Sequence, residues 1–400
     1  MNKKSATLIV LAPLLLAFAY YTLVRRIEPF MYQFYLMAWW SFICFLDAIL
    51  ALGTTRFLVL NRHFAFLVTM SAAFWCIFEM VNGRLQNWFY INIPQGIGFR
   101  FAGYFLAFGT VIPAIRLSEE QLERILPDIK VRPLSLKGYP KVALPLGLAC
   151  LTLALVFPVY CFALAWVFLA FIIDGFNYRR GYPSFAGDIE RGDLKPMLAA
   201  GLAGMICGFL WEFWNYWSIA KWVYTVPFFE GLKIFEMPAP GFLGFAFFAL
   251  GTMAFLALLR SSPILARSKW PLSVLALIFC FVSFLLIDHY TVFSYTARVD
   301  QLPFLSDNDR AAIEATGART SYAIDPRLLG REERERLALL QLKGLGLRGF
   351  NALDQYGVDT VARLSELDQN ELSSILQERN MRRVKVYLKA AKEWGHAKQP

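Results

Sequence analysis

Two stretches of the chain decide its fold: FWCIFEMVNGRLQNWFYINIP at 74–94 and GFLWEFWNYWSIAKWVYTVP at 208–227. In each, Asn follows Glu by three residues, and Trp-x-Tyr and Pro come next. The shared positions are Glu79, Asn82, Trp88, Tyr90 and Pro94 in the first stretch, and Glu212, Asn215, Trp222, Tyr224 and Pro227 in the second. Further matches are FLAFGTV (105–111) with FFALGTM (247–253), and a Trp eight residues before an Asp (Trp39 and Asp47, Trp166 and Asp174). Because these landmarks recur in the same order, the sequence predicts a tandem repeat.

Nine apolar runs are long enough to cross a bilayer, which takes about 20 mostly apolar residues. They lie at about 7–24, 31–54, 64–81, 98–117, 141–157, 159–176, 196–217, 240–259 and 271–289. The sequence therefore predicts an all-α fold, a polytopic membrane helix bundle of about nine spans. Its expected parts are repeat one (1–117), a cytoplasmic amphipathic loop (118–140), repeat two (141–260) and a ninth span (261–290). Four spans per unit make the two repeats parallel, related by an axis along the membrane normal.

The composition excludes several other classes of protein. The 400 residues are 57% hydrophobic and only 18% charged, with a mean hydropathy of +0.46. Soluble domains are nearer 45–50% apolar and about a quarter charged, so a soluble multidomain enzyme or a disordered chain is excluded. All six cysteines lie inside apolar runs and none forms a CxxC pair. The cysteines therefore do not indicate a disulfide framework.

The basic residues of the predicted loops indicate the orientation. With the N-terminus in the cytoplasm, the cytoplasmic loops carry 17 Lys and Arg and the opposite loops carry six. Cytoplasmic loops of membrane proteins have this excess. We therefore expect a multi-pass protein of the cell (inner) membrane, with a cytoplasmic N-terminus and an extracytoplasmic C-terminal domain. The net charge of +10 then reflects the loop bias more than an affinity for nucleic acid.

Polar groups inside the predicted spans mark a candidate site. A Glu and an Asn three residues apart share one helix face, and the stripe of Ala200, Gly204 and Gly208 should turn Glu212 toward another helix. We expect a cavity near the outer leaflet, lined by carboxyl groups, for general acid–base catalysis or ligand binding. In the alternative interpretation, each Glu bonds its Asn and a Trp N–H and only holds a turn in place. The candidate catalytic residues are Glu79, Glu212, Asn82, Asn215, Asp288 and His289.

The remaining polar and aromatic landmarks receive simpler interpretations. The Trp-x-Tyr segments form either an interfacial aromatic belt or a lid over an apolar ligand. The candidate ligand-binding residues are Trp88, Tyr90, Trp222 and Tyr224. We expect Asp47 and Asp174, nearer the cytoplasmic side, to stabilise helix ends. With three His and no HExxH spacing, the sequence predicts no metal site and indicates no particular cofactor.

The run WEFWNYWSIAKWVYTVPFFEGLKIFEMP (211–238) resembles the small membrane lycopene cyclase domains of carotenoid synthesis. The shared order is an acidic residue after Trp at a helix end, a Trp-x-Tyr, a Gly and an apolar step to Pro. The matching positions are Glu212, Trp222, Tyr224 and Pro238. The resemblance implies closure of isoprenoid ends by carboxyl groups that donate protons in an apolar cavity. The acidic pair that follows the Pro in this family is absent, because Ala239, Pro240 and Gly241 stand there.

The polar tail has a different character. Residues 291–329 are expected to form a linker with a short helix near 307–316. The stretch LLQLKGLGLRGFNALDQYGVDTVARLSELDQNELSSIL (339–376) resembles a helix–hairpin–helix domain, which we place at 330–400. In DNA-binding versions of this domain the hairpin backbone holds a phosphate. Here the candidate residues for binding nucleic acid or a protein partner are Lys343, Gly344, Gly346 and Arg348. With 13 basic and 10 acidic residues in 330–400, the charge favours a protein partner over nucleic acid.

Two functions follow from these patterns. The first is an integral membrane protein, embedded in the lipid bilayer, that binds or transforms a hydrophobic, isoprenoid-like or carotenoid-like ligand. The alternative is a membrane-anchored assembly protein whose tail docks a protein or, with less support, nucleic acid. The sequence does not decide whether the protein is an enzyme.

Overall fold

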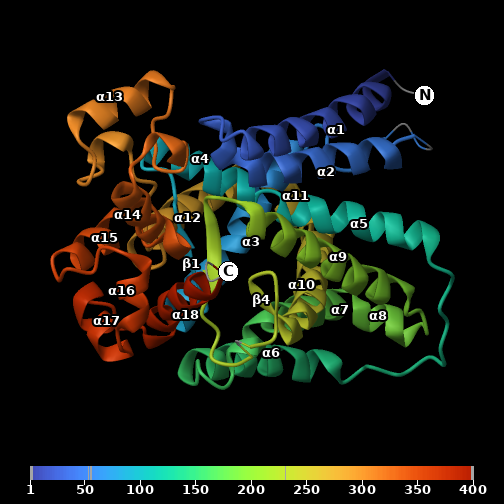
Figure 1. Cartoon of the computed structure of the whole chain (residues 1–400). Coiled ribbons are helices and arrows are strands. Elements are labelled where there is room, and N and C mark those ends of the chain that lie inside the picture. Colours follow the sequence, from blue (N-terminus) through green and yellow to red (C-terminus); the bar gives the residue numbers. More distant parts are fainter. Residues whose placement is uncertain (1–2, 53, 55, 230, 398–400) are drawn as a thin grey trace.

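The structure, a computed structural model, describes residues 3–52, 54, 56–229 and 231–397. It is predominantly helical, as the sequence predicted (Figure 1). Among the described residues, eight helical segments are long and apolar enough to cross a membrane, which fits a membrane protein. They are α1 (Lys3–Val24), η1 (Phe30–Gln33) with α2 (Phe34–Leu50), α3 (Phe64–Leu85), α4 (Ile97–Phe108) with α5 (Val111–Ile125), α6 (Tyr139–Val156), α9 (Lys195–Trp217), η3 (Ala239–Gly241) with α10 (Phe242–Ser261), and α12 (Lys269–Tyr290).

The segment predicted as a span at 159–176 is not one of these eight. After α6 the chain turns, forms the 3₁₀ helix η2 (Phe162–Trp166) and only then enters α7 (Phe168–Arg180). Pro158 lies in the turn and cannot continue α6. The continuous α-helix that follows has 13 residues, too few to cross a bilayer as one regular helix. The described residues therefore contain eight long apolar helices where about nine spans were predicted, and the return along α6 is made by η2 and the short α7 together.

Helix α7 nevertheless runs back along α6. A Cβ on Gly147 of α6 would lie 2.8 Å from the carbonyl oxygen of Phe168, at the start of α7. A Cβ on Gly175, near the end of α7, would lie 2.4 Å from the Cβ of Ala143, near the start of α6. Because small residues let helices approach closely, the two helices form a tight antiparallel hairpin.

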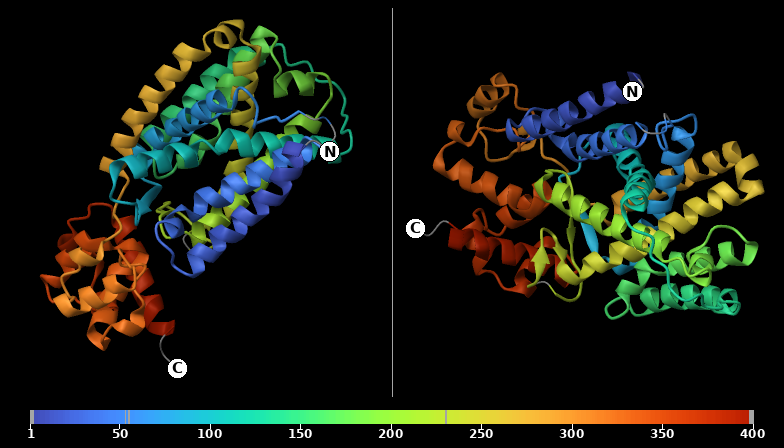
Figure 2. Two further views of the ribbon diagram at one scale, coloured as in Figure 1. Left: turned by 90° about the horizontal axis from the view of Figure 1, so that it is seen from above. Right: turned by 90° about the vertical axis from the view of Figure 1, so that its right-hand side faces the viewer.

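The loops gather at two ends of the bundle. Contacts at the end where α1 begins are Lys4–Leu60, Arg124–Leu50, Lys130–Asp193 and Lys269–His63. At the end where α1 finishes, Arg26 donates to the carbonyl of Ile324, and Glu28 accepts the Thr320 hydroxyl of the C-terminal domain. Figure 2 shows this domain beyond one end of the helices and the N-terminus toward the other. The start of α1 and the C-terminal domain therefore lie at opposite ends of the bundle.

The segment 118–140, expected as a cytoplasmic amphipathic loop, is partly helical in the structure. Its first part continues the fourth span, because α5 extends to Ile125 and follows α4 with only a short break. Arg116 forms ion pairs with Glu119 and Glu120 one turn later, so the charges at this end of the helix are paired. The irregular connection to α6 thus begins only at residue 126.

Helices α9 and α10 pack through the predicted small-residue stripe. A Cβ on Gly204 would lie 2.2 Å from the carbonyl oxygen of Phe245, and one on Gly208 would lie 2.1 Å from its ring. Such distances are far below van der Waals contact, so only glycine permits this approach. The stripe therefore places α10 directly against the helix that carries Glu212.

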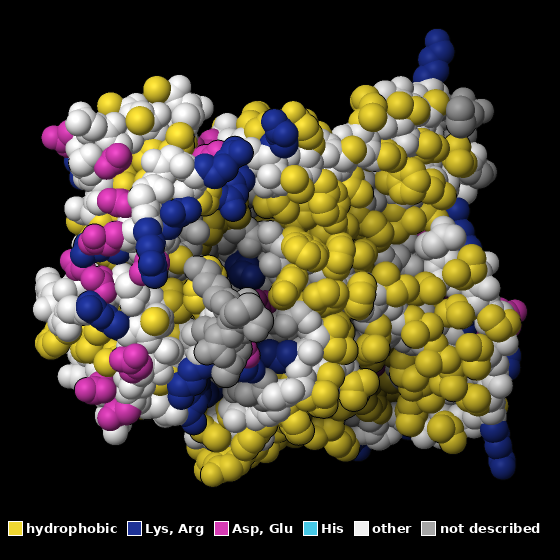
Figure 3. All heavy atoms as spheres, in the orientation of Figure 1, with side chains coloured by type: hydrophobic (Ala, Val, Ile, Leu, Met, Phe, Trp, Pro, Cys, Tyr) yellow, Lys and Arg dark blue, Asp and Glu magenta, His cyan; other side chains and the backbone are white. Residues whose placement is uncertain are grey.

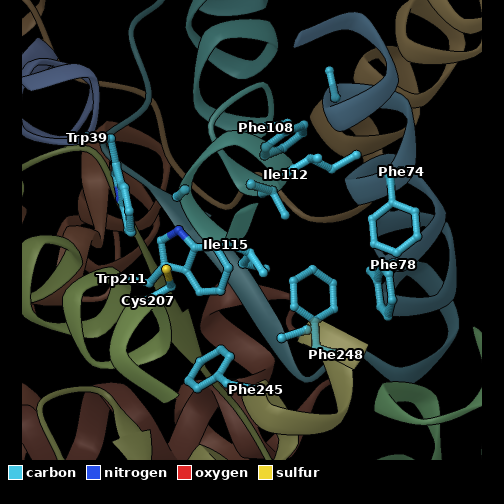
Figure 4. Close-up of a cluster of buried hydrophobic side chains, with 14 of the residues drawn as sticks. Trp39, Phe74, Phe78, Phe108, Ile112, Ile115, Cys207, Trp211, Phe245 and Phe248 are labelled. Atoms are coloured by element: carbon cyan, nitrogen blue, oxygen red, sulfur yellow. The ribbon is translucent and has the colours of Figure 1, made fainter. Parts of the chain in front are cut away.

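Aromatic side chains fill the centre of the bundle. Figure 4 shows Trp211 and Phe245 on one side of Phe248, and Phe74 and Phe78 on the other. The ring of Phe248 lies 5.9 Å from Trp211 and 4.9 Å from Phe78, centroid to centroid, and both pairs are edge-on. Aromatic pairs prefer such edge-on contacts. Residues from α3, α9 and α10 thus share one core.

The two Trp-x-Tyr segments pair with each other. Strand β1 (Trp88–Ile91) and strand β2 (Lys221–Tyr224) form an antiparallel ribbon at the end near the C-terminal domain. The register places Trp88 opposite Tyr224 and Tyr90 opposite Trp222. Each Trp of one motif therefore faces the Tyr of the other. A second pair, β3 (Lys233–Ile234) and β4 (Met237–Pro238), follows β2.

Asp47 and Asp174 hold the opposite end of the bundle together. The Asp47 carboxylate accepts backbone N–H groups of Leu58, Val59 and Leu60. The Asp174 carboxylate accepts those of Phe185 and Ala186 at the start of α8 (Phe185–Glu190). Both residues thus stabilise the connections that follow their helices, the structural role expected from the sequence. The short helix α11 (Pro263–Arg267) lies in another loop at this end.

The tail forms one small α-helical domain. Its elements are η4 (Val299–Gln301), α13 (Asp307–Ala315), η5 (Pro326–Leu328), α14 (Arg331–Gln341), η6 (Leu342–Gly344), α15 (Gly346–Asp354), α16 (Val361–Glu366), α17 (Gln369–Leu376) and α18 (Met381–Ala397). The stretch expected as a linker contributes Leu302, Ile313 and Ile324 to the same core as Leu339 and Leu364. This stretch is therefore part of the domain's core, and α13 matches the short helix predicted near 307–316. Figure 3 shows charged side chains on this domain and a largely apolar surface over the bundle.

Candidate functional site

A cavity lies beneath the β1–β2 ribbon, between the two predicted repeats. Its empty space amounts to about 1050 Å³, open solvent at the mouth included. Its wall is largely aromatic and comes from η1, α2, α3, α4, η2, α9, α10 and the ribbon. The aromatic lining residues are Tyr32, Tyr35, Trp75, Trp88, Tyr90, Phe99, Tyr104, Phe108, Trp166, Trp211, Trp222, Tyr224 and Phe245. All four candidate ligand-binding residues are thus brought to one cavity.

Glu212 is the acidic residue of this wall. Its side chain is fully buried. Oε1 accepts the Tyr224 hydroxyl at 2.8 Å, whereas Oε2 has no hydrogen-bond partner among the described residues. The indole Nε1 of Trp222, in the same wall, is likewise buried without a partner in the described part of the chain. Buried polar atoms are normally bonded. The Trp222 indole lies close to the Glu212 carboxyl, so the two unpaired atoms are neighbours and form a polar spot in a largely aromatic wall.

Asn82 and Asn215 position the ribbon strands. Asn215 donates to the Trp222 carbonyl at 2.9 Å and accepts the Trp222 N–H at 3.0 Å. Asn82 donates to the Trp88 carbonyl at 2.9 Å and accepts the N–H groups of Asn87 and Trp88. Both amides are buried at the ends of their helices and bond backbone rather than the neighbouring Glu. Both Asn residues therefore hold the Trp-x-Tyr segments in place instead of contacting the cavity.

Glu79 has a different environment from Glu212. Its Oε1 accepts three donors, the indole N–H groups of Trp75 and Trp88 and the Tyr90 hydroxyl. Its Oε2, like that of Glu212, is buried with no hydrogen-bond partner among the described residues. Glu79 itself lines a second cleft between α3 and α12, together with Met80, Gly83, Leu286, Ile287, Tyr290 and Thr291. Glu79 thus holds three aromatic side chains of the wall in place. The alternative interpretation expected it to accept a Trp N–H, which it does, and to bond its Asn, which it does not. The two related Glu residues are not equivalent.

The tyrosines that bond these carboxyl groups are neutral donors. Burial, and next the nearby Glu79 carboxyl, raise the pKa of Tyr90 well above its usual value. Burial and Glu212 do the same to the pKa of Tyr224. Both hydroxyls therefore keep their protons at neutral pH and hold the Glu side chains in fixed positions.

Asp288 and His289, which the sequence grouped together, separate in the structure. Asp288 forms a bidentate ion pair with Arg100, with a shortest distance of 2.6 Å, and accepts the Tyr104 hydroxyl at 3.0 Å. Arg100 and Tyr104 line the cavity, so Asp288 holds two side chains of the wall in position without lining the cavity itself. His289 is exposed and stacks edge-on against Tyr290, away from the cavity lining. Arg100 was missed by the sequence reasoning, although an Arg inside an apolar run was a signal for it.

An ion cluster lies where the ribbon meets the C-terminal domain. Glu236 is 3% exposed, and its Oε1 accepts from Lys343 at 2.9 Å and from Lys221 at 3.1 Å. Burial opposes ionisation of Glu236, but Lys221 and Lys343 outweigh it and lower its pKa to about 2. Burial lowers the pKa of Lys221, and Glu236 opposes that change. Lys221 also lines the cavity, so the cluster connects the tail to the site.

The predicted hairpin of the tail packs against the ribbon. Lys343, Gly344 and Gly346 all have positive φ, which favours glycine. A Cβ on Gly344 would lie 2.4 Å from Ile91 of β1, and one on Gly346 would lie 2.6 Å from Ser294. Arg348 is the only exposed member of the candidate set Lys343, Gly344, Gly346 and Arg348. The described structure thus uses the hairpin glycines in an internal contact.

Comparison of the chain with protein-family models, with curated proteins and with solved structures finds no match. Within the described ranges, no group of three or more His, Cys, Asp and Glu side chains is placed to hold a metal ion. The chemistry of the cavity therefore has to be argued from its own side chains, chiefly the aromatic wall and the carboxyl of Glu212.

Proposed function

We propose that the protein is a membrane protein whose aromatic cavity binds a long apolar ligand of the isoprenoid class. The observation that carries the proposal is the fully buried carboxyl of Glu212, with one oxygen unpaired, in a wall of aromatic rings. Apolar pockets with a few placed polar groups are typical ligand sites. A hydrocarbon chain with double bonds fits such a wall, because the rings supply contact area without demanding hydrogen bonds.

Glu212 would act as the acid in this site. A carboxylate without compensation is costly in an apolar cavity, so we propose that Glu212 carries a proton on Oε2. Transfer of that proton to a terminal carbon–carbon double bond would break the O–H bond and form a C–H bond and a carbocation. Attack by a second double bond would close a ring, and loss of a proton back to the carboxylate would restore Glu212. The sequence of steps is a net isomerisation that needs no oxidant or reductant.

The aromatic wall supports this role as well as binding. The faces of Trp, Tyr and Phe rings attract cations. Trp211, Trp222 and Phe245 line the same cavity as the carboxyl and would stabilise a developing positive charge. The resemblance of residues 211–238 to lycopene cyclase domains implies the same kind of chemistry. Binding without reaction is the simpler form of the proposal and requires the same cavity.

We also propose that the two halves of the bundle are a tandem repeat. The matching Asn-to-Trp backbone bonds and the ribbon centred on Phe89 and Val223 support this. So does the exchange of aromatic contacts, since Trp39 packs on Trp211 and Trp166 packs on Phe78, each beside the Glu of the other half. An axis along the membrane normal would relate the halves, with the N-terminus cytoplasmic and the tail on the opposite side.

The alternative, a membrane anchor whose tail docks a partner, has less support. The hairpin that the helix–hairpin–helix resemblance assigns to binding is packed against β1. A protein or nucleic acid could bind it only after the domain separates from the bundle. We therefore propose that the tail serves first as a cap on the ribbon, with Arg348 and its exposed surroundings as the surface left for a partner.

The test is to identify what the cavity holds. The full chain, purified in mild detergent from cells that make isoprenoids, should retain an apolar compound detectable by mass spectrometry of an organic extract. Glu212→Gln should leave folding intact and reduce turnover of the bound compound. Glu119→Gln, which changes a buried carboxyl of α5 outside the cavity lining, is the matched control. The proposal would be refuted if the extract of the natural chain contained only bulk phospholipid and if Trp211→Ala retained the same amount of it.

A further inference from the structure

The ion cluster at the edge of the cavity is unbalanced. Two ammonium groups, Lys221 and Lys343, share one oxygen of one carboxylate, Glu236. Glu236 is ionised at neutral pH, because its pKa is about 2. One negative charge therefore faces two positive charges in a setting where the carboxylate is almost fully buried. An uncompensated charge is costly where it is buried. This applies to Lys221, whose side chain is 14% exposed, more than to Lys343, whose side chain is 33% exposed and partly solvated.

The other charged groups near the cavity do not supply that anion. Arg100 is matched by Asp288, and its remaining N–H groups donate to the carbonyls of Pro94 and Gln95. Glu212 is the acid of the proposed function and would contribute no charge while it holds its proton. Among the described charged groups at the cavity, the excess positive charge therefore lies in the Lys221–Glu236–Lys343 cluster.

Lys221 also has a donor to spare. An ammonium group has three N–H donors, and Lys221 uses two of them, toward Glu236 and toward the Tyr216 carbonyl at 3.1 Å. The residue lines the cavity. Its neighbour Trp222 brings the unpaired indole N–H to the same wall. Lys221 and Trp222 thus bring two donors to one largely aromatic wall, where a ligand can supply the acceptor.

We infer that the cavity takes an amphipathic ligand, a single apolar chain that ends in an anionic head, phosphate or carboxylate. The head binds the Lys221 ammonium and the Trp222 indole N–H, and the chain lies among the aromatic rings. The inference rests on the proposed function, since it adds a head group to the apolar ligand of the same cavity. The C-terminal domain contributes through Lys343, which adds the second positive charge beside the head.

The experiment compares ligands that differ only in the head. The purified full chain in detergent is titrated with geranylgeranyl diphosphate, the neutral alcohol geranylgeraniol, oleate and inorganic pyrophosphate, with tryptophan fluorescence as the signal. We expect at least one of the two anionic chains to bind tighter than the alcohol by about tenfold or more, as a buried charge pair gives. Pyrophosphate alone should bind weakly, because it lacks the chain. Preference for the diphosphate or for oleate identifies the source of the head.

Variants locate the effect. Lys221→Gln should remove the preference for the anionic chains and leave the affinity for the alcohol, whereas Lys221→Arg should keep the preference. Arg84→Gln removes an exposed positive charge at the same end of the bundle and should change neither affinity. If Lys221→Gln does not fold, the comparison of heads on the natural chain still decides the matter.

The outcomes separate the two proposals. Equal affinity for the alcohol and both anionic chains would overturn the anionic head while the apolar site stands. Failure of every chain to bind would overturn the proposed function itself. Binding of pyrophosphate as tightly as its prenyl ester would show a surface anion site and overturn the inference.

Discussion

Glu212 accepts the hydroxyl of Tyr224 at 2.8 Å from the strand that follows its own helix, twelve residues along the chain. The bond fixes one carboxyl oxygen and leaves the other, Oε2, unpaired in the wall of the cavity. Glu79 makes the corresponding bond to Tyr90 but gains two indole donors as well. Two carboxyl groups from similar sequence motifs thus have environments suited to different roles.

The first prediction concerns the Tyr224 hydroxyl. Tyr224→Phe keeps the ring in the wall and removes the hydroxyl that donates to Glu212. We expect a loss of about 0.5–1.5 kcal/mol in the free energy of unfolding and weaker retention of the bound compound. Denaturant titration in detergent and mass spectrometry of extracts measure the two effects. Tyr356→Phe, an exposed tyrosine of the tail, is the control, and equal losses in both variants would contradict the prediction.

The second prediction concerns Glu79 as a support of the wall. Glu79→Ala leaves two indole N–H groups and the Tyr90 hydroxyl without an acceptor. A buried donor left unpaired costs about 1–3 kcal/mol, so this variant should be strongly destabilised in thermal or denaturant unfolding. Glu79→Gln retains an acceptor oxygen and should lose much less. An alanine variant as stable as the natural chain would show that the three bonds do not hold the wall.

The third prediction concerns the packing of α9 on α10. Gly208→Ala places a methyl group 2.1 Å from the ring of Phe245. Because Phe245 also lines the cavity, we expect destabilisation of about 1–3 kcal/mol and a smaller cavity that retains less ligand. Gly201→Ala is the matched control on the same helix, since its methyl group would meet only Ala246 at 3.9 Å. That variant should be neutral or gain about 0.5–1 kcal/mol.

The fourth prediction concerns docking of the C-terminal domain. Glu236→Gln leaves Lys221 and Lys343 facing each other without an anion, so the contact between tail and ribbon should weaken by about 3–5 kcal/mol. Faster proteolytic release of the tail would show this. Arg348→Gln, on the exposed side of the same domain, should have no effect. Release at the natural rate would mean that the ion cluster does not hold the domain.

The pH dependence of this contact follows from the same carboxylate. The folded pKa of Glu236, about 2, is below its ordinary value of 4.5. The unfolded or undocked form therefore takes up a proton first as the pH falls. The contribution of Glu236 should be complete above about pH 4.5 and should be lost progressively between about pH 4.5 and pH 2. Proteolysis by an acid-active protease should show this loss in the natural chain and not in Glu236→Gln.

The last prediction concerns the sides of the membrane. The start of α1 and the C-terminal domain lie at opposite ends of the bundle, and the proposed orientation places the tail outside the cytoplasm. A tag after residue 400 should be accessible to a membrane-impermeant reagent in intact cells, and a tag before residue 1 should not. Reversed labelling would contradict the orientation and leave the fold unchanged.

The sequence alone determined the parts of this protein whose signals are local. Length and apolarity predicted the long helices, the Glu-to-Asn spacing put both groups on one helix face, and the glycines before Glu212 predicted the close approach of another helix. These features depend on residues within a few turns of one another. The sequence wrongly predicted one continuous span at 159–176. The 3₁₀ helix η2 before α7 depends on how the turn packs, which local spacing does not specify.

The tertiary structure decided how these parts form a site. Pairing of Tyr90 with Trp222, residues 132 positions apart, brings two aromatic segments over one cavity. The same packing pairs Arg100 with Asp288, gives Glu79 three hydrogen-bond donors and Glu212 one, and turns the hairpin of the tail inward against Ile91. Local spacing fixes which residues share a helix face, but not which face of another helix they meet. Contacts over such distances follow from packing of the whole bundle, so two similar motifs could acquire different chemistry.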